Sequence, residues 1–181
     1  MDRKTHIINT YLELGSKNGF SSVSLNDIAE KEGINKASIF SHFKSYSELK
    51  EQADNFCLNI LQSKEISVDF TASSVQEVLE NLINGFIDTF SDSVLNKWLI
   101  CLEQLKSTSP KHKTCSEAID SMINARITVA LDYCVQRGWS DLNDTDAVSA
   151  LLTPFVRSVL ISPEEKEDTL EDVLSAFTEM I

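Results

Sequence analysis

The sequence predicts an all-α protein with a small N-terminal domain of three helices and a larger C-terminal helical domain, about nine helices in all. Only 5 glycines and 3 prolines interrupt the 181 residues. Apolar residues recur at helical spacing along most of the chain, and no alternating run bounded by hairpin turns predicts a strand. With 42% hydrophobic residues, the chain is long enough for one small and one larger domain. We place these domains at residues 1–50 and 51–181.

The first helix is predicted near the N-terminus by an apolar face of helical period. Ile7, Ile8, Tyr11 and Leu12 form this face, and Gly15 follows it. We expect this helix to pack across the helix pair that comes next.

Two short capped helices joined by a glycine turn are predicted between residues 24 and 44. Ser24 and Asp27 have the spacing of an N-terminal cap, whose oxygens accept hydrogen bonds from unpaired backbone N–H groups. Gly33 favours the left-handed conformation that ends a helix. Asn35 is expected to cap the second helix.

The second helix of this pair has two different faces. Ile39 and Phe43 are four residues apart and point inward, so the opposite face is centred on Ala37 and Ser41. Such a small, polar face lets a backbone approach base edges in the major groove, and Lys36 in the first turn is within reach of a guanine or a phosphate. The pattern therefore predicts a helix-turn-helix that binds DNA.

Residues 3–50 resemble the DNA-binding domain of the TetR family of bacterial transcriptional regulators. The resemblance is carried by Asn-Gly-Phe at 18–20, Ser-Leu-Asn-Asp-Ile-Ala at 24–29, Gly33-Ile34 and Ser-Ile-Phe-Ser-His-Phe-Lys at 38–44, which occur in the family's order and spacing. It implies a regulator, commonly a repressor, that binds a palindromic operator as a homodimer and is released by a small molecule. It covers about a quarter of the chain.

The residues expected to contact DNA lie on this N-terminal segment. They are Arg3, Lys4, Ser24, Asn35, Lys36, Ala37, Ser38, Phe40, Ser41, His42, Lys44 and Tyr46. Two of them depart from the family pattern. Phe40 stands where the family usually has a phosphate-bonding tyrosine, and Tyr46 stands where it usually has a lysine, so one phosphate contact is missing and another is weakened.

The charge distribution is consistent with DNA binding by the N-terminal domain and not by the C-terminal domain. The whole chain has a formal net charge of −12, yet residues 1–50 hold 7 basic and 6 acidic residues against 9 and 22 in residues 51–181. An acidic C-terminal domain repels phosphates, which favours docking through the N-terminal face. Taken one by one, most of these charges are also consistent with ordinary solvated helix faces.

The remaining helices are predicted from caps and apolar stripes. Ser45 and Glu48 cap a helix over 46–63, a polar break follows at 64–74, and Ser73 or Ser74 caps the next helix. The other helices are expected at 94–105, about 114–137 ending at Gly138, 144–161 and from Pro163 onward, with a loop at 107–113.

Apolar residues of the central helices are candidates for an inducer pocket, as the resemblance implies. They are Phe56, Ile60, Phe86, Phe90, Trp98, Leu102, Leu105, Met122, Ile123, Arg126 and Tyr133, and Arg126 or His112 at the rim would hold an acid group. Apolar residues at helical spacing are more often plain core. If the pocket exists, its few charges favour a mostly apolar ligand.

The two C-terminal helices are the candidate dimer interface. The expected residues are Leu151, Leu152, Phe155, Val159, Leu170, Val173, Leu174 and Phe177. A four-helix contact across a two-fold axis would place the two helix-turn-helix units of the dimer, here called readers, on successive major grooves roughly 34 Å apart. The alternative is that this hairpin only closes the core of the monomer.

Several other classes of protein are disfavoured. No signal peptide or apolar run of about 20 residues is found, so a cytoplasmic protein is expected, with no membrane partner. No catalytic constellation, metal-ligand spacing or cofactor motif is present, which argues against an enzyme. Cys57, Cys101 and Cys134 are expected to be buried hydrophobes, and Cys115, which lies close to two lysines, is the candidate for a redox switch. The main rival function is a TetR-like interaction protein whose chief partner is another protein.

Overall fold

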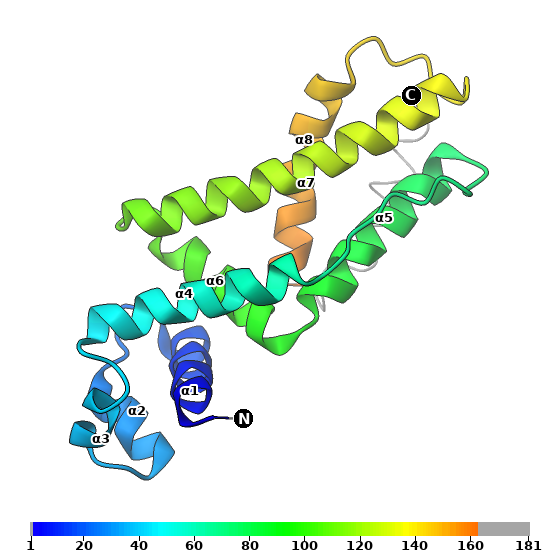
Figure 1. Ribbon diagram of the computed structural model, residues 1–181. Coiled ribbons are helices and arrows are strands. Elements are labelled where there is room, and N and C mark those ends of the chain that lie inside the picture. Colours follow the sequence, from blue (N-terminus) through cyan, green and yellow to red (C-terminus); the bar gives the residue numbers. More distant parts are fainter. Residues whose placement is uncertain (1, 163–181) are drawn as a thin grey trace. The chain divides into compact units, whose positions relative to one another are not determined.

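The computed structural model describes residues 2–162, and all the secondary structure in this part of the chain is helical. Eight helices follow one another: α1 (Arg3–Asn18), α2 (Leu25–Glu32), α3 (Lys36–Phe40), α4 (Tyr46–Gln62), α5 (Val75–Phe90), α6 (Ser93–Leu105), α7 (Pro110–Gln136) and α8 (Thr145–Ile161). The predicted all-α class is confirmed (Figure 1). The helix expected after Pro163 lies outside the described residues.

Four of the eight helices in residues 2–162 begin at a side-chain cap that the sequence predicted. Ser74, and not Ser73, caps α5 by accepting from the backbone N–H of Glu77, while Ser73 donates to the Glu77 carboxylate. Ser45 caps α4 in the same way, accepting from Glu48. These bonds satisfy donors that would otherwise be unpaired in the first turn.

One predicted loop is shorter than expected. Residues 107–113 were predicted to be a loop because they contain Pro110, yet α7 begins at that proline. The Lys113 N–H donates to the Ser109 carbonyl at 3.0 Å, which is the first bond of the helix. Proline fits the first helical position because its φ is already helical and its missing N–H would have no partner there.

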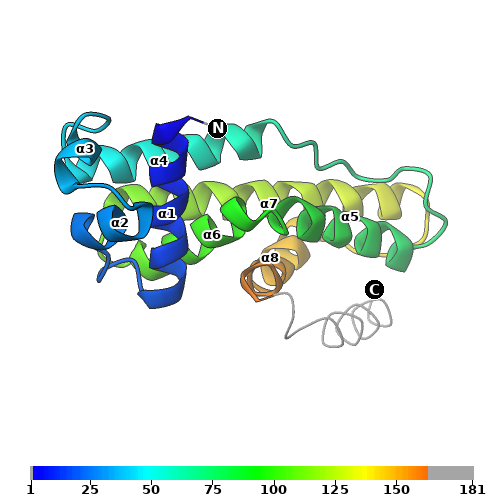
Figure 2. The same cartoon turned by 90° about the horizontal axis from the view of Figure 1, so that it is seen from below.

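The chain forms two compact units that do not follow the expected boundary at residue 50. The first contains residues 1–64 and 92–114, and the second contains residues 65–91 and the chain from Cys115 onward. The first unit therefore includes α4 and α6, because α1 packs on both of them. Figure 2 shows α1 crossing α4.

Each unit has its own apolar core. In the first, Tyr11, Ile28, Phe43, Leu49 and Trp98 are at most 1% exposed. In the second, the buried side chains come from α5, α7 and α8, among them Leu82, Phe86, Ile123, Leu131 and Val156. No helix in residues 2–162 is long and apolar enough to cross a membrane.

Three of the four cysteines are buried, as expected. Cys57, Cys101 and Cys134 are at most 1% exposed, and Cys115 is half-buried. Burial raises the pKa of the Cys101 thiol to about 12 and also raises the pKa of Cys57 and Cys134. These three side chains therefore stay protonated and act as small hydrophobic groups.

Candidate nucleic-acid interface

The turn between α2 and α3 is fixed by backbone and side-chain bonds. Ser24 and Asp27 form a reciprocal capping box, with Ser24 N donating to Asp27 Oδ2 at 2.7 Å and Asp27 N to Ser24 Oγ at 3.3 Å. Gly33 has φ +65°, a conformation that strains any residue with a Cβ. Asn35 Oδ1 then accepts from Ser38 N at 2.8 Å, so the start of α3 is pinned.

Helix α3 presents the small-residue face that the sequence predicted at the surface. Ile39 and Phe43 are 1% exposed and anchor the segment. Ala37 and Ser41 are exposed on the other side. An exposed, nearly side-chain-free ridge lets a backbone come close to a flat partner.

The helix itself is shorter than predicted. It ends at Phe40, so His42 lies in the turn that follows and not in the helix. The His42 N–H donates to the Ile39 carbonyl at 3.0 Å, which is a three-residue turn and not a further helical repeat. Ser38 is half-buried, and its hydroxyl donates to Asn35 Oδ1 at 2.9 Å.

The lysines and arginine expected to contact DNA fall into two groups. Within residues 2–162, the exposed side chains of Lys36 and Lys44 form no ion pair. Arg3 is paired with Glu32 at 3.4 Å. Lys4 is half-buried, donates to Gln52 at 3.3 Å and lies over the ring of Phe43. Lys36 and Lys44 are thus the cations of the set that remain uncommitted.

Tyr46 makes its contacts inside the first unit. Its hydroxyl donates to the carbonyl of Val23 at 2.6 Å, and its ring meets that of Tyr11 edge-on at 6.1 Å. Burial raises its pKa to about 12. The expectation that Tyr46 supplies a neutral phosphate donor is therefore corrected, because its one proton is already bonded inside the unit.

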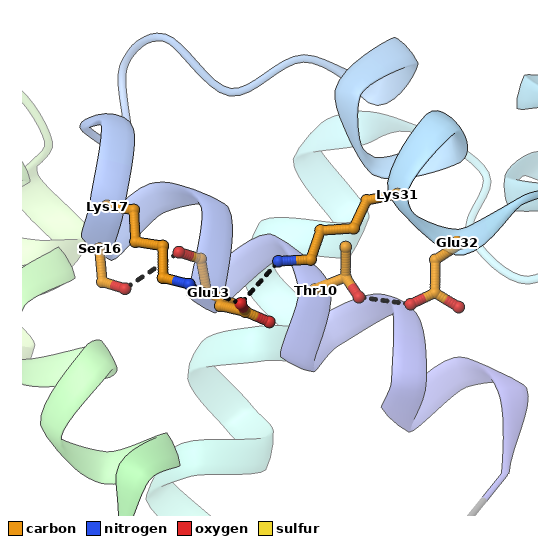
Figure 3. Close-up of polar contacts among 6 residues, drawn as sticks. All are labelled: Thr10, Glu13, Ser16, Lys17, Lys31 and Glu32. Carbon is orange, nitrogen blue, oxygen red and sulfur yellow. Dashed lines mark hydrogen bonds and ion pairs between the residues drawn. The ribbon is translucent and has the colours of Figure 1, made fainter.

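A set of ionic and hydrogen bonds joins α1 to α2. Figure 3 shows Glu13 of α1 between Lys31 of α2 and Lys17, with Nζ–O distances of 2.6 and 2.9 Å. The hydrogen bonds from these two lysines lower the pKa of Glu13 to about 2. Beside it, the Thr10 hydroxyl donates to Glu32 (Figure 3). Glu32 therefore holds both Arg3 and Thr10 on the last turn of α2.

A buried carboxylate joins α4, α6 and the start of α7. Asp54 is 2% exposed and accepts from Trp98 Nε1 at 3.1 Å. Lys111 and His112 approach it at 3.4 and 3.6 Å. His112 was expected at the rim of a ligand pocket and lies instead buried against Asp54, where burial lowers its pKa.

These polar contacts were not predicted from the sequence. Glu32 and Asp54 lie far along the chain from their partners, as Glu13 does from Lys31, and no local motif marks these contacts. Gln104 is a fourth example, since its Oε1 accepts from the backbone N–H of Phe20 at 2.9 Å. The only sequence signal is a charged or amide side chain on an otherwise apolar helix face.

The residues predicted to line an inducer pocket are divided between the two units. Five of them are core, at most 1% exposed: Phe86, Phe90, Trp98, Leu102 and Ile123. Phe56, Ile60, Leu105, Met122 and Tyr133 are half-buried, and Arg126 is exposed.

Two of the half-buried pocket candidates have identifiable surroundings. Tyr133 donates its hydroxyl to the Phe70 carbonyl at 2.6 Å and packs edge-on against the Phe70 ring. Phe56 lines a cleft of about 180 Å³ in the first unit, together with Ile8 and Gln52. No group of three or more His, Cys, Asp or Glu in residues 2–162 is placed to hold a metal ion.

The predicted dimer residues on α8 lie in different environments. Leu151 is 77% exposed and Phe155 is half-buried, whereas Leu152 and Val159 are 6% and 1% exposed and belong to the core. The other four, Leu170, Val173, Leu174 and Phe177, lie outside the described residues.

A family model matches the segment that contains the candidate interface. Residues 7–53 match the model of "Bacterial regulatory proteins, tetR family". The HTH-type transcriptional regulator YerO of Bacillus subtilis is 30% identical over 93 residues, which cover 50% of this chain but only 32% of that protein.

Solved structures show that the whole fold is similar to known regulators. The transcriptional regulator PfmR from Thermus thermophilus superposes with a TM-score of 0.68 at 18% identity, covering 99% of this chain and 96% of that one. The ketosteroid transcriptional regulator KstR2 of Mycobacterium tuberculosis gives 0.67 at 14% identity, over 97% and 94% of the two chains. At such low identity the likeness concerns the fold alone.

Proposed function

We propose that this chain, whose residues 7–53 match the model of the tetR family of bacterial regulatory proteins, is a DNA-binding transcriptional regulator that acts as a homodimer on a palindromic operator. The observation that carries the proposal is the exposed face of α3. Ala37 and Ser41 are exposed on this face, while Ile39 and Phe43 on the opposite side are buried. Lys36 and Lys44 flank that face with cations that no described acid neutralises.

In this proposal the contacts have separate tasks. Lys36, at the first position of α3, reaches a base edge or a phosphate in the major groove. Lys44 and the Ser24 hydroxyl contact the phosphate backbone and set the position of the helix-turn-helix, whereas the hydroxyls of Ser38 and Ser41 already donate to Asn35 Oδ1 and to the Ser38 carbonyl. Asn35 fixes the start of α3, while Arg3 and Lys4 support the reader from α1 through Glu32 and Gln52.

The dimer follows from the size of the reader. One short helix contacts too few base pairs for a specific site, whereas two readers related by symmetry occupy successive major grooves of a palindrome. Leu151 and Phe155 on α8 supply exposed and half-buried apolar surface for such a contact. Contiguous apolar patches are typical of association surfaces, and these two side chains are four residues apart and so lie on one side of α8.

Regulation is proposed to be repression relieved by a small, mostly apolar ligand. An apolar ligand is favoured because Arg126 is the only charged residue among the predicted pocket residues. The ligand then shifts the population toward a spacing of the two readers that no longer fits the operator. The size of this shift is limited by the ligand's differential affinity for the two states.

DNA selection with the full-length protein tests the proposal. Purified protein should enrich a palindromic sequence from a random library, and the double variant Lys36→Ala/Lys44→Ala should lose at least tenfold in affinity, since each lysine contributes a charged contact. Lys64→Ala, which removes an exposed lysine beyond the end of α4, is the control and should bind like the wild type. Failure to enrich any sequence would refute DNA reading.

A second function is favoured by the missing phosphate donors. Phe40 has no hydroxyl, and the Tyr46 hydroxyl and the Arg3 guanidinium are bonded inside the unit. These features favour a TetR-like interaction protein whose main partner is another protein. Under this alternative, selection would yield no operator while the exposed residues of α3 and α8 would still be required for partner binding.

A further inference from the structure

Phe40 is an aromatic side chain that the fold leaves at the surface. It is 46% exposed, and among the described residues of the first unit it is the only large hydrophobic side chain with high exposure. The other exposed ones, Phe70, Val129 and Leu151, belong to the second unit. Its neighbour Ile39 is 1% exposed, so α3 packs that apolar side chain into the core and leaves Phe40 at the surface.

The position of Phe40 places it on the proposed DNA-binding face. Lys36 and Phe40 are four residues apart in α3 and therefore share one side of the helix, one turn apart. Lys36 forms no ion pair within residues 2–162. The neighbouring positions Ala37 and Ser41 are small and exposed, and the ring itself is 46% exposed. The face therefore combines one free cation with one free apolar ring.

The chemistry of the ring limits what it can recognise in DNA. A phenyl group has no hydrogen-bond donor or acceptor, so it cannot bond to a phosphate or to a polar base edge. The C5-methyl group of thymine is the apolar feature that the major groove offers, and phenylalanine is one of the side chains that contact it. The major groove of a duplex offers both a phosphate or base edge for Lys36 and a methyl group for Phe40.

We propose that Phe40 contacts the C5-methyl group of a thymine in each half of the operator and is a specificity-determining residue. This inference rests on the proposed function, because it requires that α3 lies in the major groove. The ring can make this contact although it lacks the hydroxyl of a tyrosine. Phenylalanine in place of the family's usual tyrosine at position 40 then replaces a contact to the DNA phosphate backbone by a contact to a base.

Replacing single thymines by deoxyuridine tests the proposal. The probe is the operator enriched from a random library by the full-length protein, with each symmetric pair of thymines replaced in turn so that only the methyl groups are removed. At one position in the half-site, the affinity of the wild type should fall about fourfold for each methyl group taken away. Other thymine positions should change much less.

Variants of Phe40 show whether this residue senses the methyl group. Phe40→Ala should bind more weakly and should no longer distinguish thymine from uracil at that position. Phe40→Tyr keeps the ring and should retain the discrimination. Lys36→Ala is the matched control, since it should weaken binding and yet preserve the uracil penalty. Because Phe40 is exposed, its alanine variant should unfold at the wild-type urea concentration.

Each outcome decides a separate point. If the protein selects an operator but no deoxyuridine position matters to the wild type, the proposal for Phe40 is wrong and DNA reading stands. The same holds if Phe40→Ala shows the wild-type penalty at the sensitive position. If the protein selects no sequence at all, the function and the proposal fall together.

Discussion

Lys36 and Lys44 are both exposed lysines of the reader, yet their positions predict different effects on DNA binding. Lys36→Ala should reduce discrimination at one base pair by about 1–3 kcal/mol, because the variant cannot bond to a base edge. Lys44→Ala should weaken binding to all sequences alike and lower the salt slope by about 1, because one phosphate is no longer neutralised. Titrations over a salt series with base-substituted operators measure both effects. Identical behaviour of the two variants would overturn these roles.

His112 gives the protein a pH dependence that belongs to a single residue. Burial lowers its pKa, with Lys111 and Lys50 acting in the same direction and Asp54 opposing them. As the pH falls below the unfolded value near 6.5, the unfolded state binds a proton more readily than the folded state does. The free energy of unfolding therefore falls with falling pH.

The test compares urea unfolding at a pH of about 7, 6 and 5. In His112→Gln the decline over this interval should be smaller than in the wild type. His6→Gln removes a histidine that is exposed and serves as the control. An unchanged slope in His112→Gln would show that this imidazole does not carry the effect.

At the scale of single residues, the site could be predicted where its bonds are local. Ser24, Gly33 and Asn35 act within three or four positions of themselves, so their roles follow from spacing. Tyr46 and His112 could not be placed, because the groups that hold them, the Val23 carbonyl and Asp54, come from distant parts of the chain. Sequence spacing carries no information about such partners.

At the scale of elements, close packing between α1 and the loop after it depends on Gly15. A Cβ at Gly15 would lie 2.2 Å from the Phe20 ring, which is 3% exposed and packed on Tyr11. Alanine would gain about 1 kcal/mol in helix propensity, but overpacking in a filled core costs about 1–3 kcal/mol. We expect Gly15→Ala to lower the free energy of unfolding by up to about 2 kcal/mol overall, measured by urea unfolding.

Gly33 provides a contrast to Gly15 in the same experiment. No atom lies within 4 Å of a Cβ placed there, so only the backbone conformation at φ +65° opposes substitution. Gly33→Ala should cost about 1–2 kcal/mol, and Gly33→Asn should cost less because asparagine tolerates this conformation. A Gly15→Ala variant as stable as the wild type would show that the Phe20 ring moves aside freely.

The boundaries of the elements were predictable where a cap and an apolar stripe agree. Helix α4 begins after the predicted cap Ser45, α5 begins after Ser74, one of its two candidate caps, and α8 begins one residue after its expected start at residue 144. Helix α7 begins earlier than expected, because Pro110 was interpreted as a helix breaker and is in fact its first residue. A proline alone does not distinguish a loop from a helix start when the preceding residue can accept the first helical bond.

At the scale of the whole molecule, the compact units differ from the predicted domains because tertiary packing groups α4 and α6 with the reader. Trp98 and Asp54 are joined by a buried hydrogen bond, and Gln104 holds the backbone of Phe20. These links make the reader part of a five-helix unit and not an independent three-helix domain. A displacement of α6 would therefore act directly on α1 and α4, which contact it.

The oligomeric state is the last property that depends on the whole molecule, and two adjacent leucines of α8 separate assembly from folding. Leu151 is 77% exposed, so Leu151→Glu places a charge in solvent and should leave the unfolding of the monomer unchanged. At a dimer contact, the same carboxylate would be desolvated without a partner. Light scattering at micromolar concentration should therefore show a dimer for the wild type and a monomer for this variant.

Leu152→Ala should have the opposite effect. Leu152 is 6% exposed, so truncation should lower the free energy of unfolding by about 2–5 kcal/mol while the protein that stays folded keeps its dimer mass. Since a monomer carries one reader, Leu151→Glu should also lose affinity for the palindrome while binding a single half-site as weakly as the wild type does. A wild type that scatters as a monomer, or a Leu151→Glu variant that remains dimeric, would exclude this face of α8 from the interface.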